Sequence, residues 1–381
     1  MAPGEPEGFR PPPYPYERLS GLKELAEAVP GGMVDCSIGT PCDPPPSVAL
    51  RALVEPGAAR GYPPSAGTSA FRAAAAAYLA RTFGVDLLPT ALAACVGTKE
   101  MVASTPRYLR LRDPSRDTVL YPSVSYPTYA MGAQLADCRA VPVPPADADG
   151  AGVDLDAVAL ADVRRALLLW VNSPANPSGG LSDLVAAASW GRRHGVPVFS
   201  DECYAEYTWE SPPRTILQCG TDGVVAVHSV SKRSNLAGVR AGFFGGDAEL
   251  VGYLRDVRQH AGMMVPGPVQ ATAVAAWSDD AHVIVQRARY RERLELLAAA
   301  LSGVGCPTSM PAGGFYLWSA VPPRWHDAWA MTEDLAKVSG MLVSPGDLYG
   351  PDGAGHVRIA VVQPTERLAL VAERLAASGW S

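Results

Sequence analysis

The stretch Val196-Pro197-Val198-Phe199-Ser200-Asp201-Glu202-Cys203-Tyr204 joins a short apolar run to a carboxylate and a phenol. A second apolar run, at residues 224–227, leads in the same way into His228-Ser229-Val230-Ser231-Lys232. Apolar runs of this length are typical of buried strands in a parallel sheet, and such sheets bind ligands at the carboxyl ends of their strands. The two stretches therefore predict an α/β fold in which Asp201 and Lys232 follow neighbouring strand-like segments at a ligand-binding edge.

Strand-like and helical segments alternate through most of the chain. Further apolar runs lie at 92–96, 118–121 and 166–171, and amphipathic helical stretches such as 69–82 and 183–193 separate most of the runs. This alternation favours a mostly parallel sheet that is covered by helices on both faces.

The pattern changes beyond about residue 262. Helical sequence dominates from 266 to 301, and strand-like pieces at 315–320 and 356–361 precede a closing helix at 365–377. We therefore predict a large domain and a smaller α+β domain that is built from both chain ends. The expected limits are residues 1–45 for an N-terminal arm and part of the small domain, 46–265 for the large cofactor-binding domain, and 266–381 for a linking helix and the rest of the small domain.

The beginning of the chain is rich in proline, which predicts an extended arm over the first twenty residues. Apolar residues then recur at helical spacing from Leu19 to Val29, and Pro30-Gly31-Gly32 ends that helix.

Composition narrows the class of protein. The 381 residues are 48% apolar and 18% charged, and the net charge is −6 without a basic block. These values predict a globular protein that binds neither nucleic acid nor an anionic membrane. Seven scattered cysteines without a C-x-x-C pair argue against a disulfide framework and a zinc site, so no metal is expected. With no secretion signal and no apolar run of membrane-spanning length, we expect a cytoplasmic location.

The residues around Lys232 indicate that it binds a cofactor. A lone lysine is usually a surface residue, but Ser229 and Ser231 offer hydroxyl groups beside it and Arg240 offers a fork for phosphate oxygens. Asp201 would keep a pyridine nitrogen protonated. Together these groups match the needs of pyridoxal 5′-phosphate, which forms a Schiff base with a lysine.

Other segments offer further contacts for that cofactor. Tyr204 would donate to the ring oxygen, and Tyr126 would stack on the ring. Gly97-Thr98-Lys99 opens a helix after a strand, where free N–H groups bind phosphate. Asn176 is either a turn former or a donor to the ring oxygen, and Arg358 would clamp a substrate carboxylate.

The combination of Asn176-Pro177, Asp201-x-x-Tyr204, Ser229-x-Ser231-Lys232 and Arg240 resembles the class I/II aminotransferases of fold type I. The resemblance runs from Gly39 to Arg358. It implies that Lys232, Asp201 and Tyr204 are catalytic. It also implies the following cofactor-binding residues: Tyr62, Gly97, Thr98, Lys99, Tyr126, Asn176, Asp201, Tyr204, Ser229, Ser231, Lys232 and Arg240. Gly39, Asn176 and Arg358 would bind the substrate.

The family resemblance also implies a homodimer with shared active sites. Tyr62 would reach the phosphate in the partner's site, and the loop at residues 260–266 would border that site.

Several stretches are more similar to one subgroup, the actinobacterial N-succinyldiaminopimelate aminotransferases. They include Val96-Gly97-Thr98-Lys99-Glu100 and Pro345-Gly346-Asp347-Leu348-Tyr349-Gly350. Arg233, Asn235 and the segment Ser104-Thr105-Pro106 depart from the residues expected there. The substrate is therefore left open, and four residues are candidates for binding its distal group: Lys99, Arg233, Arg258 and His260.

We therefore predict an aminotransferase that acts on a dicarboxylic, N-succinyldiaminopimelate-like amino acid with glutamate and 2-oxoglutarate. The alternative is a diverged enzyme that uses the same residues for elimination, replacement or bond formation on an activated amino acid such as S-adenosylmethionine. Two other readings fit less well. The S-x-x-K pattern of penicillin-binding proteins lacks its S-D-N and K-T-G partners here, and an aminotransferase-like regulator would need a DNA-binding domain before Leu19.

Overall fold

The computed structural model describes residues 8–54, 57, 59–147 and 150–380. Its centre is a seven-stranded sheet in the order β2-β8-β7-β6-β5-β3-β4. Strand β8 runs antiparallel to both of its neighbours, and every other neighbouring pair is parallel. The predicted mostly parallel sheet is thus confirmed. Its strands are β2 (Leu92–Cys95), β3 (Thr118–Pro122), β4 (Arg139–Val143), β5 (Ala166–Asn172), β6 (Val198–Asp201), β7 (Val224–Ser229) and β8 (Gly242–Gly246).

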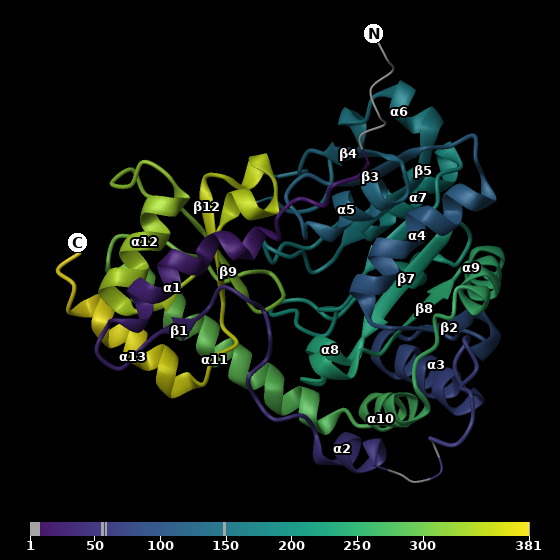
Figure 1. The fold of residues 1–381 in the computed structure, drawn as a ribbon, viewed down its shortest axis with the longest axis horizontal. Coiled ribbons are helices and arrows are strands. Elements are labelled where there is room, and N and C mark those ends of the chain that lie inside the picture. Colours follow the sequence, from purple (N-terminus) through teal and green to yellow (C-terminus); the bar gives the residue numbers. More distant parts are fainter. Residues whose placement is uncertain (1–7, 55–56, 58, 148–149, 381) are drawn as a thin grey trace.

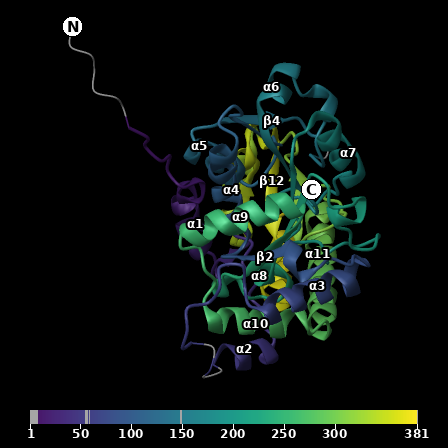
Figure 2. The ribbon, with the colours of Figure 1, turned by 90° about the vertical axis from the view of Figure 1, so that its right-hand side faces the viewer.

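Side chains of this sheet pack into two hydrophobic cores, one on each face. In β5, Leu169 and Val171 belong to one core, whereas Leu168 and Trp170 belong to the other. This alternation follows from the two-residue period of a strand, and it requires helices on both sides of the sheet (Figure 2). The helices of this part are α2 (Ser47–Leu53), α3 (Ser69–Phe83), α4 (Thr98–Arg112), α5 (Thr128–Leu135), α6 (Leu160–Arg165), α7 (Leu184–His194), α8 (Val230–Arg233), α9 (Ala248–His260) and α10 (Gly267–Trp277).

Local signals fix the ends of these helices. Asp183 caps α7 by accepting from the backbone N–H of Ala186, and the helix stops at Gly195, which has a left-handed φ of 61°. A short polar cap at the start and a glycine after the end are the expected stop signals for a helix. The helix therefore covers nearly the stretch that the sequence predicts.

A smaller part of the molecule is built from both ends of the chain, as predicted (Figure 1). Strand β1 (Val34–Asp35) pairs in parallel with β10 (Met341–Leu342). A second sheet has the order β11-β12-β9 and is antiparallel. The remaining elements are β9 (Tyr316–Ala320), β11 (Ser344–Pro345), β12 (His356–Ala360), α1 (Ser20–Glu27), α11 (Ala281–Gly303), α12 (Ala328–Ser339) and α13 (Thr365–Ala376).

The helical region predicted at 266–301 forms two helices, α10 and α11, that pack into different cores. Trp277 of α10 is buried in the core of the large part, whereas Leu294 and Leu297 of α11 are buried in the core of the small part. The long helix α11 joins these two parts (Figure 1). The predicted domain limits at residues 45 and 265 remain predictions.

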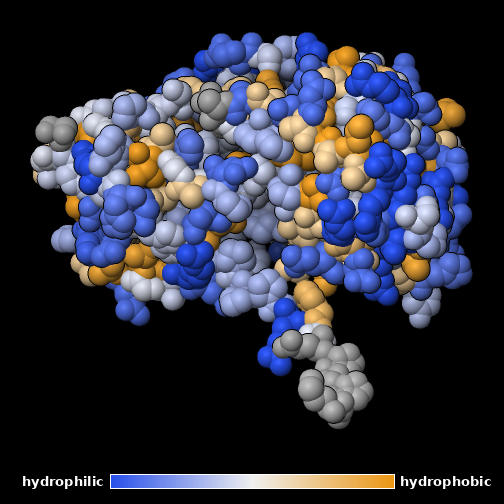
Figure 3. Space-filling model, turned by 90° about the horizontal axis from the view of Figure 1, so that it is seen from above, coloured by the Kyte–Doolittle hydropathy of each residue, from blue (hydrophilic) through white to orange (hydrophobic). Residues whose placement is uncertain are grey.

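The N-terminal arm, taken here as residues 8–18, has no regular structure up to a 3-10 turn that begins at Pro15. Residues 1–7 of the predicted arm lie outside the described residues. Figure 3 shows the described start of the chain standing out from the body, on a face where hydrophilic and apolar side chains are mixed. None of the described helices is both long and apolar enough to cross a membrane.

Candidate active site

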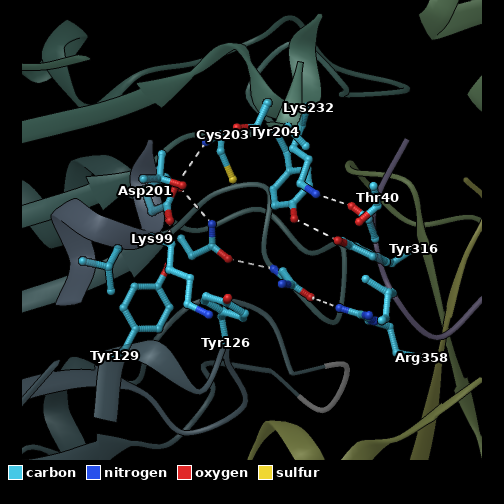
Figure 4. A pocket seen from close by; sticks show the side chains of 18 of the residues that line it. Thr40, Lys99, Tyr126, Tyr129, Asp201, Cys203, Tyr204, Lys232, Tyr316 and Arg358 are labelled. Carbon is cyan, nitrogen blue, oxygen red and sulfur yellow. Dashed lines mark hydrogen bonds between the residues drawn. The ribbon is translucent and has the colours of Figure 1, made fainter. Parts of the chain in front are cut away.

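A cavity of about 360 Å³ lies between the large and the small part, at the carboxyl ends of β5, β6 and β7 (Figure 4). Parallel sheets bind their ligands at this edge. The cavity brings together most of the residues that the sequence singles out. These are Gly39, Thr98, Lys99, Tyr126, Asn176, Asp201, Tyr204, Ser231, Lys232, Arg240 and Arg358.

Lys232 enters the cavity from α8, the short helix that follows β7. Its ammonium group donates to the backbone carbonyl of Gly39. Burial lowers the pKa of this amine to about 8, and the positive charges of Arg358 and Arg240 act in the same direction. A larger fraction of Lys232 is therefore neutral and nucleophilic at neutral pH than for an exposed lysine.

Asp201 is the last residue of β6 and is only 6% exposed. Its carboxylate accepts from the backbone N–H of Cys203 at 3.2 Å and from the hydroxyl of Tyr129 at 3.3 Å. Burial raises the pKa of Asp201, and none of the described lysines or arginines forms an ion pair with it. A buried carboxylate in this state favours a cationic ligand atom, such as a protonated ring nitrogen.

The start of α4 has the features of an anion-binding site. Gly97 precedes the helix with a φ of 77° and supplies no side-chain cap, so the first N–H groups of α4 stay available. A Cβ at Gly97 would collide with the guanidinium of Arg240. The hydroxyl groups of Ser229 and Ser231 are bonded to each other at 2.8 Å, and Ser231 also lines the cavity. Helix N–H groups, hydroxyl groups and an arginine together suit a phosphate.

Arg358 lies on β12 of the small part and is 2% exposed. One of its terminal nitrogens donates to the side chain of Asn176 at 2.8 Å, and the other donates to the backbone carbonyl of Ser37. Its guanidinium also packs on the rings of Tyr316 at 4.4 Å and Tyr349 at 4.7 Å. Among the described residues, its Nε has no hydrogen-bond partner. The guanidinium is thus held in one orientation at the cavity wall, and its buried Nε keeps an unused N–H.

Comparison with known proteins identifies the family. Residues 32–375 match the family described as aminotransferase class I and II. The chain belongs to the class I and II aminotransferases. It is 43% identical to the probable aminotransferase Rv1178 of Mycobacterium tuberculosis over 375 residues, covering 96% of this chain and 85% of that protein. It is 42% identical to the 4-dedimethylamino-4-oxo-anhydrotetracycline transaminase OxyQ of Streptomyces rimosus, covering 96% of this chain and 99% of that protein.

Several solved structures share the fold. The substrate-bound BacF structure from Bacillus subtilis is 25% identical with a TM-score of 0.89, and the match covers 98% of both chains. A probable N-succinyldiaminopimelate aminotransferase from Thermus thermophilus is 31% identical with a TM-score of 0.85, covering 96% of this chain and 100% of that one. This aminotransferase is therefore a fold-type I transferase that depends on pyridoxal phosphate.

The residues present fit pyridoxal phosphate on grounds that are independent of the family. The anion site at α4, the amine of Lys232 and the buried carboxylate of Asp201 match the phosphate, the aldehyde and the ring nitrogen of that molecule. When bound, the cofactor draws electrons away from the α-carbon of an amino acid. The chain's own residues have to hold the reactants in place, keep water out and move protons.

The N-terminal arm supplies cavity residues that the sequence did not indicate. Tyr14 and Tyr16 both line the cavity. The ammonium of Lys99 lies 5.0 Å from the ring of Tyr14 and 5.8 Å from the ring of Tyr126, and it donates to the Tyr14 hydroxyl at 3.5 Å. The arm therefore closes part of this aminotransferase's pocket, although no recognised motif marks it.

The arm also attaches to the small part. The hydroxyl of Tyr16 lies 3.0 Å from that of Tyr349. Arg18 forms an ion pair with Asp347 at 3.2 Å and packs over the ring of Trp329 at 4.3 Å. Together with the contact between Tyr14 and Lys99, these contacts hold the arm between the two parts of the aminotransferase.

Two of the candidate residues for a distal substrate group lie away from the cavity. Arg233 is buried and forms ion pairs with Glu206 and Asp280. Arg258 is paired through both terminal nitrogens with Glu100, at 2.5 and 2.7 Å. Their charges are satisfied inside the protein, so the expectation that they bind substrate is not met in this subunit. His260 and Tyr62 are exposed, Tyr62 by 99%, and neither lines the cavity.

Proposed function

We propose that this enzyme transfers the amino group between a dicarboxylic amino acid of the N-succinyldiaminopimelate kind and the pair 2-oxoglutarate and glutamate. The observation that carries the proposal is the position of the Lys232 amine in one cavity with Arg358 and with the anion site at α4. A substrate carboxylate held by Arg358 and a cofactor phosphate held at α4 would bring the reacting carbon near Lys232. This arrangement supports proton transfer by Lys232 at the α-carbon.

The other residues have supporting roles in this proposal. Asp201 keeps the cofactor's ring nitrogen protonated, and Tyr204 and Asn176 flank its ring oxygen. Tyr126 covers the ring, and Gly39 borders the substrate. The phosphate is held by groups from three segments, which are the backbone N–H groups of Gly97, Thr98 and Lys99 and the side chains of Ser229, Ser231 and Arg240.

Lys99 is the favoured residue for the distal group of the substrate. It lines the cavity, and no ion pair with an acidic side chain is found for it among the described residues. Its neighbours are the phenols of Tyr14 and Tyr126, which orient the ammonium without neutralising its charge. A distal carboxylate would supply the missing negative charge. The name of the Thermus thermophilus relative and the 33% identity with an LL-diaminopimelate aminotransferase of Desulforudis audaxviator agree with a substrate that carries more than one charged group.

The same proposal includes a homodimer with shared sites. Tyr62 is 99% exposed beside a groove that Pro63, Pro64 and α10 line. The loop at residues 260–266 is fixed against this region, because the Ser65 hydroxyl donates to the carbonyl of Met263 at 2.9 Å. Apolar groups exposed in one place favour an interface. In a dimer, Tyr62 would reach the phosphate in the partner's site.

The elimination and bond-forming alternative gains no support from the relatives, which are named as aminotransferases or transaminases. OxyQ nevertheless acts, by its name, on an anhydrotetracycline ketone. A bulky ketone is therefore included as an amino acceptor in the test below.

An absorption spectrum of the purified protein with bound pyridoxal phosphate tests the proposal. Glutamate should convert the visible band of the lysine-bound cofactor into that of the amino form, and 2-oxoglutarate should restore it. N-succinyl-LL-diaminopimelate should do the same as glutamate, whereas alanine should act far more slowly. A response only to an anhydrotetracycline ketone would replace the proposed substrate. A response only to S-adenosylmethionine would replace the proposed reaction.

A further inference from the structure

The hydroxyl groups of Tyr204 and Tyr316 lie 2.9 Å apart inside the protein. Tyr204 follows β6 of the large sheet, and Tyr316 is the first residue of β9 in the small sheet. They are 4% and 1% exposed. The bond thus connects the two parts of the molecule at the cavity wall, where both phenols line the pocket (Figure 4).

Tyr316 has little freedom to move its hydroxyl elsewhere. Its ring lies under the guanidinium of Arg358 at 4.4 Å and beside the ring of Phe315 at 4.8 Å. Its oxygen sits against Gly39, and a Cβ at that position would overlap with it. The glycine therefore leaves room for the phenol, while its own carbonyl accepts from Lys232.

Either hydroxyl can donate in this bond, so a further partner has to set its direction. Burial raises the pKa of Tyr204 and of Tyr316, so both phenols are neutral at neutral pH. Each hydroxyl then carries one proton. When the Tyr204 hydroxyl donates its hydrogen bond to an acceptor in the cavity, its oxygen can only accept the hydrogen bond from Tyr316. A hydroxyl that accepts a hydrogen bond is itself a stronger donor.

We propose that Tyr316 is a positioning residue that fixes the hydroxyl of Tyr204 as a donor toward the cofactor's ring oxygen. The inference rests on the proposed function, because the acceptor of Tyr204 is part of that proposal. Since Tyr316 belongs to the small sheet, the donor is fully oriented only while the small part lies against the large one. The two aromatic partners of Arg358 then differ in role, because Tyr349 bonds to Tyr16 and not to Tyr204.

Tyr316→Phe tests this role, and Tyr349→Phe is its matched control. Both variants keep the ring beside Arg358 and lose one buried hydroxyl. The absorbance of the visible band of the holoenzyme is measured as a function of pH. The midpoint of this titration reports how well the negative charge on the ring oxygen is stabilised. The other charged or titratable groups that act on the phenols are Arg358, Cys203 and Tyr16, Lys232 lines the same cavity, and both variants retain all four.

The expected result is an upward shift of the midpoint by about half to one pH unit in Tyr316→Phe, from the loss of one hydrogen bond. The midpoint of Tyr349→Phe should stay at that of the parent. In a Tyr204→Phe background, Tyr316→Phe should cause no further shift.

An unchanged midpoint in a Tyr316→Phe protein that binds the cofactor would overturn the inference and leave the proposed function intact. Equal shifts in the two single variants, or an additive shift in the double variant, would also overturn it. A parent protein that forms no visible band with the cofactor would overturn the proposed function and this inference together. Thermal unfolding of each apo variant checks that only the hydroxyl has been lost.

Discussion

Lys232 and Arg358 point into one cavity from the two parts of the molecule. Lys232 follows the last strand of the parallel set, β7, whereas Arg358 lies on β12 of the small sheet. Burial lowers the pKa of the amine, and the positive charge of the nearby Arg358 guanidinium lowers it further. The group that attracts a carboxylate therefore also helps to keep the lysine neutral.

The pH dependence of cofactor uptake should reflect this pKa. Because the folded protein lowers the pKa of Lys232 to about 8, the reactive neutral amine predominates above that pH and is lost as the pH falls through it. The rate at which the apo-protein develops the visible band with pyridoxal phosphate should rise with a midpoint near 8. A midpoint near that of a free lysine, about 10.4, would contradict the assigned environment.

Lys232→Ala should reduce amino transfer by at least about a thousandfold, because the variant lacks both the attachment point and the proton carrier. Borohydride reduction followed by mass analysis should find the cofactor attached in the parent and not in the variant. Lys337→Ala is the control, since Lys337 is exposed and pairs with Glu333 on α12. A variant at position 232 that retained the parent rate would exclude the lysine from catalysis.

Asp201→Asn should have opposite effects on the two forms of the protein. Burial raises the pKa of Asp201, because it disfavours the ionised form of the side chain. The protonated carboxyl group therefore stabilises the apo-protein at low pH, and this contribution is lost as the pH rises through the folded pKa. At neutral pH the neutral amide should therefore raise the Tm of the apo-protein, by about 1–3 °C. The same change should weaken retention of the cofactor. Differential scanning calorimetry with and without pyridoxal phosphate measures both, and a lower apo Tm would count against the assignment.

Arg358→Lys and Arg240→Lys should separate substrate binding from cofactor binding. The first change removes the planar guanidinium, which can form two hydrogen bonds with a carboxylate, from the proposed substrate site. It should raise KM for the amino acid about 10- to 100-fold. The second should instead raise the Kd for pyridoxal phosphate, because Arg240 stands against the start of α4. Steady-state kinetics and cofactor titration distinguish them. If both variants changed the same constant, one of the two placements would be wrong.

Lys99→Met should lower kcat/KM for dicarboxylic amino acids about tenfold while leaving monocarboxylic ones nearly unchanged. Tyr14→Phe is the matched comparison, because it removes only the hydroxyl that Lys99 contacts at 3.5 Å. Its effect should be smaller and in the same direction. Equal losses for both classes of substrate would place Lys99 with the phosphate and not with the distal group.

The sequence predicted the elements whose local pattern is strong and missed those that depend on tertiary contacts. Strand β5 is predicted because six of its seven residues, Ala166–Val171, form one continuous apolar run. Strand β8, Gly-Phe-Phe-Gly-Gly, was not foreseen because so many glycines read as a turn. Strand β4 contains Pro142 and lies at the sheet edge, the position where proline is tolerated in a strand.

The site shows the same limit. The motif residues Asp201 and Lys232 were found because they directly follow or end strong strands. No local pattern shows that the charge of Arg233 is neutralised, because its partner Asp280 lies 47 residues away. Tyr16 and Tyr316 were missed for a related reason, because a tyrosine has no spacing that marks it as part of a pocket.

The arm has one more consequence, for how this enzyme changes between lineages. Within residues 8–18 no side chain is fully buried, yet Tyr14 and Tyr16 face the pocket. Exposed segments tolerate substitution at little cost in folding free energy, whereas buried strands do not. Substitutions in this one short segment can therefore change the range of substrates that fit the pocket. The reaction itself depends on Lys232 and the strands around it, which such substitutions leave unchanged.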